Sequence, residues 1–125
     1  MRQLKFRVWD KLQERYTRCD EGYQGHYVLS LKGEFHNLQN GSGGKEYVVQ
    51  QYTGLKDKNG KEIYEGDIVK ATSNQYENEN FVGKVIFDEG CFLTWVNKND
   101  IRGIWGEDDI EVIGNIIENS ELLEK

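Results

Sequence analysis

Four residues have thiol or imidazole side chains, the groups of zinc sites and of Cys–His nucleophiles: Cys19, His26, His36 and Cys91. A zinc site needs three or four Cys, His or carboxylate ligands brought together, usually with a closely spaced pair among them. None of these residues forms such a pair, and Cys91 falls inside an apparent strand. The spacing therefore does not indicate a metal site, and it gives no positive sign of a Cys–His nucleophile. We expect surface histidines and packed thiols.

Two loops superficially resemble ligand-binding motifs. A phosphate-binding loop needs a glycine six residues before the Lys of its Gly-Lys pair, and Ser or Thr directly after that Lys. Gly44-Lys45 is followed by Glu46, and Gln39 occupies the first glycine position. The segment Asp57–Gly60 resembles the start of a calcium loop, but Glu62 and Ile68 stand where glycine and glutamate are required. Both motifs fail, so we interpret the second one as a turn.

Carboxylates cluster at one further place, which contains Glu107, Asp108, Asp109 and Glu111. Such a cluster on a loop is usually solvated, and we prefer that interpretation to a divalent-cation site. No pair of carboxylates stands out for acid–base hydrolysis. We therefore expect no catalytic, cofactor-binding or metal-binding residues, and a protein that is not an enzyme.

Cations alternate with an aromatic side chain at the N-terminus, as they do on surfaces that track phosphates and stack bases. The residues are Lys5, Arg7, Trp9, Lys11, Arg15 and Arg18. On a strand, Lys5, Arg7 and Trp9 would share the face opposite Leu4, Phe6 and Val8. The net charge of −6 disfavours long-range attraction to nucleic acid. We therefore prefer an ordinary solvated strand face and keep nucleic-acid binding as an alternative.

Charge is unevenly distributed along the chain. Residues 1–62 carry 11 basic and 8 acidic side chains, whereas residues 63–125 carry 5 and 14. This asymmetry would assist binding of an anion, or pairing within or between subunits. We prefer the pairing interpretation, and with it a homo-oligomer or a protein partner.

The length of 125 residues fits one domain, which can build a core without disulfides. Two widely separated cysteines indicate a reducing compartment. The sequence has no apolar run long enough to indicate a signal peptide or a membrane span. We expect a cytoplasmic protein that does not contact a membrane.

Alternating and β-branched segments predict about seven short strands, joined by Gly- and Asn-containing turns. The predicted strands are Leu4–Trp9, Tyr27–Leu31, Tyr47–Tyr52, Ile68–Thr72, Phe81–Phe87, Cys91–Val96 and Ile110–Ile116. Turns are predicted at Asn59-Gly60, Glu65–Asp67 and Asp88–Gly90, and a short helical turn after Ser120. The pattern predicts a mainly β fold, a small barrel or sandwich with short helical pieces.

Three blocks of the sequence carry a family resemblance. The central block, Gln51–Val69, reads QYTGLKDKNGKEIYEGDIV, and it is flanked by Lys5–Lys11 and Glu111–Asn119. In this order the blocks resemble the YopX family of small proteins encoded by phages and prophages of bacteria. Ser120 departs from the family pattern, in which proline is expected before Glu121-Leu122-Leu123. The resemblance implies a mainly β, small barrel-like (SH3-like or related) domain in a bacterial cytoplasm, and it supplies no catalytic residue.

The resemblance indicates one domain over residues 1–125, with N-terminal strands over 1–52 and the central turn motif and C-terminal β part over 53–125. Its turn residues are Gly54, Asn59, Gly60, Glu65, Gly66 and Asp67. Because the glycines suit turns and the neighbouring apolar side chains suit a core, we prefer a structural role for them to a ligand site.

The sequence leaves three hypotheses for the function of this protein. The first is a non-enzymatic phage accessory protein that acts through protein contacts or self-association. The second is a nucleic-acid-binding module that uses the basic N-terminal strand. The third, an enzyme, requires a pocket lined by Tyr64, Glu65 and Asp67.

Overall fold

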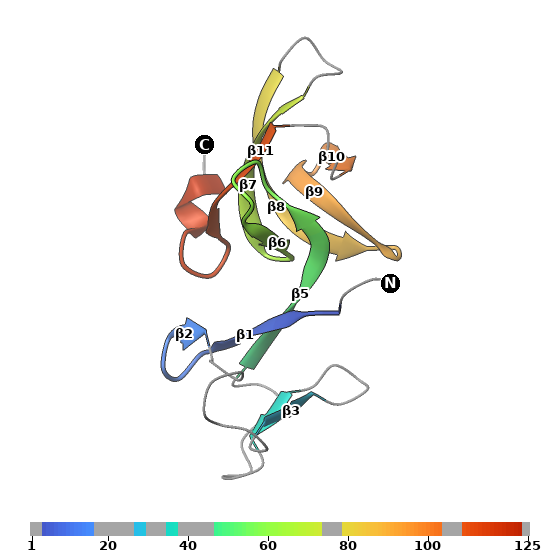
Figure 1. Cartoon of the computed structure of the whole chain (residues 1–125). Coiled ribbons are helices and arrows are strands. Elements are labelled where there is room, and N and C mark those ends of the chain that lie inside the picture. The colour runs from blue at the N-terminus through green and yellow to red at the C-terminus, as the bar shows by residue number, and fades with distance from the viewer. Residues whose placement is uncertain are drawn as a thin grey trace. The chain divides into compact units, whose positions relative to one another are not determined.

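Extended strands make up most of the computed structural model, which describes residues 4–16, 27–29, 35–37, 47–73, 79–103 and 109–123 (Figure 1). The chain divides into two compact units. One comprises Lys5–Gln51, and the other comprises Tyr52–Lys125 together with Met1–Leu4. The predicted mainly β fold is confirmed. No helix in the described part of the chain is long and apolar enough to span a bilayer.

The N-terminal unit is built from short antiparallel strands. Its elements are β1 (Phe6–Asp10), β2 (Arg15–Tyr16), β3 (Tyr27–Leu29), β4 (Phe35–Asn37) and the first part of β5 (Tyr47–Lys56). Strand β1 pairs with β2 on one side and with β5 on the other, and β3 pairs with β4. The β1–β2 turn forms because a carboxylate oxygen of Asp10 accepts hydrogen bonds from the N–H groups of Leu12 and Gln13.

The burial pattern of β1 differs from the predicted alternation. Leu4 and Phe6 are 64% and 40% exposed, whereas Trp9 is 8% exposed. Trp9 is buried because β2 brings the Tyr16 ring against it, with 5.0 Å between the ring centroids. Val8 on the opposite face is buried as well, so both faces are covered at this end of the strand.

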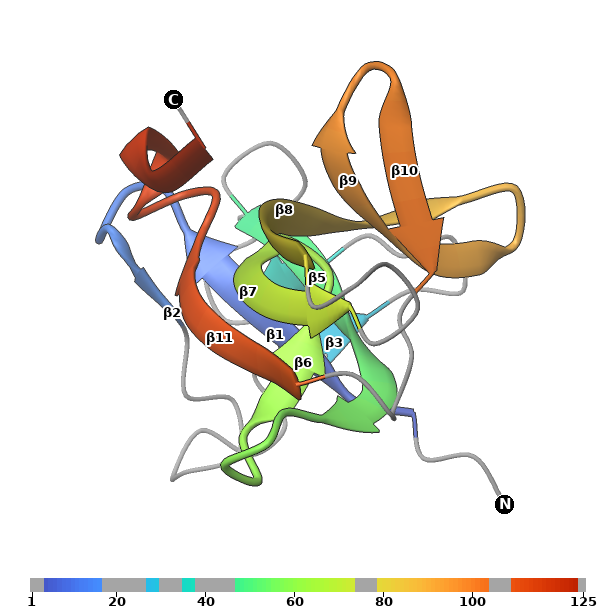
Figure 2. The ribbon, with the colours of Figure 1, turned by 90° about the horizontal axis from the view of Figure 1, so that it is seen from above.

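The C-terminal unit contains a five-stranded antiparallel sheet in the order β10-β9-β8-β7-β11. Its strands are β7 (Asp67–Ser73), β8 (Glu79–Asp88), β9 (Cys91–Asn97), β10 (Asp100–Gly103) and β11 (Asp109–Asn115). The second part of β5 pairs with β6 (Glu62–Tyr64). A 3₁₀ helix, η2 (Ser120–Leu123), follows β11. The sheet curls like half of a barrel (Figure 2), which agrees with the predicted barrel-like part.

One face of this sheet forms the hydrophobic core. The side chains alternate along each strand, so Val69 and Ala71 of β7 and Phe81 and Val85 of β8 share the inner face. Ile63 of β6 is 1% exposed and packs among them. This alternation is the period-two pattern from which the strands were predicted.

The turns predicted at Asn59-Gly60, Glu65–Asp67 and Asp88–Gly90 are present. The last two are narrower than predicted, since Asp67 begins β7 and Asp88 ends β8. Gly54 is different: it lies inside β5, where the pairing with β6 shifts register, and its φ is 90°. The prediction that Gly54 marks a turn is therefore wrong. Glycine is suited to this position because a β-bulge with positive φ strains other residues.

Several strands were not predicted. They are short or embedded in charged sequence, as β6 and β10 are, and they form because a neighbouring strand supplies hydrogen bonds. Strands β2 and β4 belong to the same group. The predicted helical turn after Ser120 is confirmed as η2.

Candidate functional site

The basic residues of the N-terminal strand are partly engaged within the protein. Arg7 Nε donates to Gln50 Oε1 at 2.7 Å, and its guanidinium lies 4.8 Å from the Tyr16 ring centroid. Among the described residues of the predicted nucleic-acid surface, Lys11 and Arg15 are exposed, while Lys5 is half-buried. Since Trp9 is buried against Tyr16, its ring is not presented to a nucleic-acid base.

The residues considered for metal or thiol chemistry are dispersed. Cys19, His26 and Arg18 lie outside the described residues, and the side chain of His36 in β4 is not described. Cys91 is an exposed free thiol, so the prediction that it is packed is wrong. It is exposed because it begins β9 directly after the β8–β9 turn. The described residues contain no group of three or more metal-ligating side chains.

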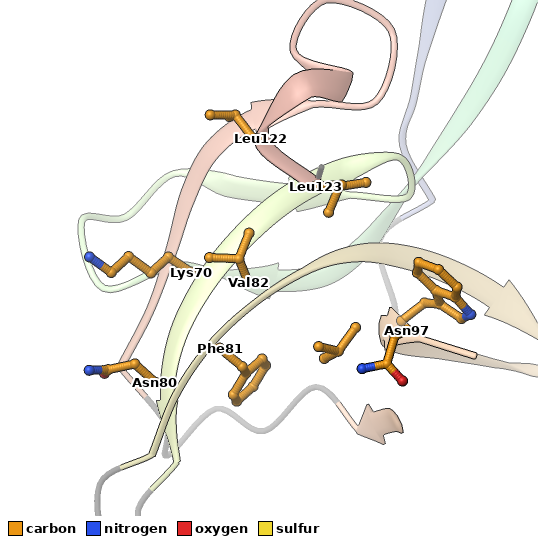
Figure 3. A pocket seen from close by; sticks show the side chains of 9 residues that line it. Lys70, Asn80, Phe81, Val82, Asn97, Leu122 and Leu123 are labelled. Atoms are coloured by element: carbon orange, nitrogen blue, oxygen red, sulfur yellow. The ribbon is translucent and has the colours of Figure 1, made fainter. Parts of the chain in front are cut away.

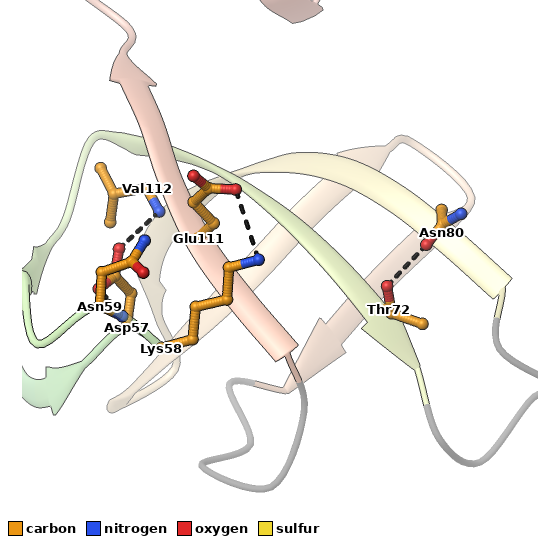
Figure 4. Close-up of polar contacts among 7 residues, drawn as sticks. All are labelled: Asp57, Lys58, Asn59, Thr72, Asn80, Glu111 and Val112. Atoms are coloured by element: carbon orange, nitrogen blue, oxygen red, sulfur yellow. Dashed lines mark hydrogen bonds and ion pairs between the residues drawn. The ribbon is translucent and has the colours of Figure 1, made fainter.

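Asp57 organises the first half of the central family motif. Its Oδ1 accepts hydrogen bonds from the N–H groups of Asn59 and Lys61, each at 2.9 Å. Its Oδ2 accepts one from the N–H of Val112 at 3.0 Å (Figure 4). The N–H of Lys58 also donates to the carbonyl of Ile110 at 2.9 Å. Because β11 is an edge strand, these contacts satisfy backbone groups that would otherwise lack a strand partner.

The pKa of Asp57 reflects this position. Burial raises the pKa, but the three backbone N–H donors, together with the positive charge of Lys61, outweigh burial and lower it below its ordinary value. The carboxylate is therefore stabilised in its charged form. It acts as a structural anchor, with its side chain already occupied by the protein's own backbone.

The second half of the motif is also structural. Asp67 is 1% exposed, and its Oδ2 accepts a hydrogen bond from the N–H of Tyr64 at 2.8 Å. The N–H of Gly66 donates to the carbonyl of Val85, while its carbonyl accepts from the N–H of Ile116, both at 2.8 Å. Asp67 is thus enclosed by the turn, so its carboxylate does not face an open pocket.

The third family block forms a hook after β11. Asn115 Oδ1 accepts from the N–H groups of Ile117 and Glu118, and Asn115 N–H donates to Asn119 Oδ1 at 3.2 Å. A Cβ at Gly114 would lie 2.7 Å from the same Asn119 oxygen. Glycine therefore permits the close approach that turns the chain toward η2.

An open groove of about 580 Å³ lies between η2 and the strands β7, β8 and β9 (Figure 3). We call it the outer groove, since Lys70 and Val82 project from the face of the sheet opposite the core; Phe81 and Val96, which also line it, belong to the core or pack against it. Apolar side chains, two amides and one lysine line it: Lys70, Asn80, Phe81, Val82, Trp95, Val96, Asn97, Leu122 and Leu123. Lys70 is the one ionisable side chain among the described lining residues.

Strand register assembles the outer groove. Lys70 of β7 is directly opposite Val82 of β8, and Lys84 is opposite Trp95 of β9. The Lys84 ammonium lies 4.6 Å from the Trp95 ring centroid, a cation–π contact. Strand β9 can approach this closely because Gly83 has no side chain. A Cβ at that position would lie 2.7 Å from the Trp95 carbonyl oxygen.

The structural role of the central motif can be predicted from the sequence, whereas the outer groove cannot. The structural role preferred for Gly54–Asp67 agrees with the contacts of Asp57, Gly66 and Asp67. None of the groove residues was singled out, because they come from three strands and a helix. The outward position of Trp95 in an alternating strand is the signal that points to this face.

Comparisons with known proteins place the chain. The family model "YopX protein" matches residues 5–124. The crystal structure of protein EF1440 from Enterococcus faecalis is 27% identical, with a TM-score of 0.63, covering 98% of this chain and 99% of that one. Protein yopX from Bacillus subtilis is 28% identical, with a TM-score of 0.63 and 98% of each chain covered. No curated protein matches. The chain belongs to the YopX protein family.

Proposed function

We propose that this YopX-family chain is a non-enzymatic accessory protein, encoded by a phage or prophage, that acts in the bacterial cytoplasm by binding a protein partner at the outer groove. The family resemblance supports the phage or prophage origin. The groove supports the mode of action, and it is the single observation on which the proposal rests.

Three properties of the groove suit a protein segment. Its volume of about 580 Å³ is within the range of ligand-binding sites. Val82, Trp95 and Leu123 offer apolar surface, and Asn80 and Asn97 offer amides that can pair with a peptide backbone. Apolar side chains surrounded by a few polar groups are typical of protein interfaces.

Site-specific photocrosslinking tests the proposal. A photoreactive amino acid replaces Val82 in the groove or, as the control, exposed Glu89 in the turn at the other end of the β8–β9 hairpin. In phage-infected host cells, the Val82 variant should crosslink to one protein that the Glu89 variant does not capture. The captured protein, once purified, should bind the wild-type chain in solution.

The outcomes separate the alternatives. Equal capture by both variants, or capture at neither position, would contradict binding at the groove. Crosslinking of the chain to itself at Val82, together with a doubled mass in light scattering, would show that a second copy of this chain, and not another protein, occupies the groove.

A further inference from the structure

The charge of the outer groove is opposite to that of the protein. Residues 63–125 carry 14 acidic and 5 basic side chains, yet Lys70 lines the groove and Lys84 lies two residues from Val82 on the same strand and the same face. Two cations are thus placed beside an apolar surface in an otherwise acidic part of the chain.

Neither lysine forms an ion pair with a carboxylate of the described residues. Glu111 is opposite Lys70 in the β7–β11 pairing, but its Oε2 lies 3.7 Å from Lys58 Nζ. Lys84 is directed over the Trp95 ring, where its charge contacts the face of the indole. The groove therefore presents positive charge that an incoming carboxylate can meet.

The wall of the groove shows that leucine side chains fit this surface. Leu122 and Leu123 of η2 line it from above and are half-buried, although η2 contains no fully buried residue. They follow the exposed Glu121 directly in sequence. The chain thus places two of its own leucines, which a carboxylate precedes in sequence, along the rim of the groove.

From these observations we propose that the outer groove binds a partner segment in which leucine-like side chains are flanked by carboxylates. The apolar side chains would lie against Val82 and Trp95, and the carboxylates would pair with Lys70 and Lys84. This inference rests on the proposed function and specifies the chemistry of the partner. A polyphosphate strand is disfavoured, since the surrounding acidic residues repel dense negative charge.

Fluorescence anisotropy with the full chain tests this chemistry. The probe is a dye-labelled nonapeptide that alternates leucine with aspartate. Two matched probes replace every aspartate with asparagine or with lysine. The wild-type chain should bind the aspartate probe about tenfold more tightly than the asparagine probe, and this preference should decrease as salt is raised.

Charge reversal identifies the responsible side chains. The double variant Lys70→Glu and Lys84→Glu should lose the preference for aspartate and bind the lysine probe more tightly. The control, Lys11→Glu with Lys98→Glu, changes the net charge equally at exposed positions and should keep the wild-type preference. Should Lys84→Glu fail to fold, Lys70→Gln alone should still weaken the aspartate preference.

Each contrary result has a defined meaning. Equal affinity for the aspartate and asparagine probes would overturn the inference. So would displacement of the aspartate probe by a single-stranded oligonucleotide at similar concentration. Absence of probe binding, together with successful crosslinking at Val82, would overturn the inference and leave the proposed function standing.

Discussion

The carboxylate of Asp57 accepts a hydrogen bond from the backbone N–H of Val112 at 3.0 Å, although the two residues are 55 positions apart in sequence. Asp57 lies in the central family block and Val112 in the C-terminal block. The contact therefore joins these two distant blocks of the sequence directly in the folded chain. The turn that begins at Asp57 holds the edge strand β11 against the rest of the curled sheet.

Asp57→Ala should lower the free energy of unfolding by about 3 kcal/mol, because it leaves the N–H groups of Asn59, Lys61 and Val112 without their acceptor. Asp57→Asn should cost about 1–2 kcal/mol, since one oxygen remains. Urea denaturation followed by circular dichroism measures both. The control is Lys58→Ala, which removes an exposed ion pair with Glu111 and should cost less than about 1 kcal/mol. Equal losses for the two positions would contradict the anchoring role.

Stability should decrease below about pH 4. The folded protein holds the pKa of Asp57 below its ordinary value, and the Arg102 guanidinium does the same for Asp100. A carboxyl with a lowered folded pKa contributes its full stabilisation above the unfolded pKa, and this contribution is lost as the pH falls through the folded pKa. Urea denaturation at a series of pH values should show a shallower acid decline for Asp57→Asn. A variant with the wild-type slope would assign the acid sensitivity to other groups.

Gly83→Ala should destabilise the C-terminal unit by about 3 kcal/mol, because the new Cβ would lie 2.7 Å from both the Trp95 carbonyl oxygen and Thr94 Cγ2. The backbone oxygen cannot move without breaking the β8–β9 pairing. Gly60→Ala is the matched comparison, since its Cβ meets nothing within 4 Å and only the φ of 82° is strained. It should cost about 1 kcal/mol. Thermal melts of both variants decide whether close approach or backbone conformation matters more.

Local sequence patterns predicted most of the C-terminal unit. The hairpin around Glu89-Gly90 and the turn at Asn59-Gly60 were predicted because alternation and glycine-containing turns act over a few residues. Features that depend on pairing between distant segments were missed. The bulge at Gly54 and the short strand β10 exist only in the context of a neighbouring strand.

The candidate sites also divide into features that local sequence predicts and features that depend on distant segments. The sequence identifies Asp57 as a turn residue, but its bond to Val112 requires the position of β11. The outer groove depends on the register that places Lys70 beside Val82 and Lys84 beside Trp95. Since register is fixed by many weak contacts together, no single segment indicates it.

Trp9 gives the sharpest distinction between a structural and a nucleic-acid-binding N-terminal strand. The ring is 8% exposed and packs against Tyr16. Trp9→Ala should therefore destabilise the N-terminal unit by about 3–5 kcal/mol, measured by amide hydrogen exchange in β1 and β5. Lys11→Glu, at an exposed position, should change stability by less than about 0.5 kcal/mol.

Oligonucleotide binding at low salt completes this test. If the strand stacks bases, Trp9→Ala should abolish binding while hydrogen exchange in β1 stays slow, and Lys11→Glu should weaken it. We expect the opposite combination. Amide exchange in β1 should become faster in Trp9→Ala, and the wild-type chain should show no oligonucleotide binding that requires the Trp9 ring. The reason is geometric: a ring enclosed by Tyr16 can stack on a base only after β2 has left β1, and that opening removes the burial that stabilises the strand.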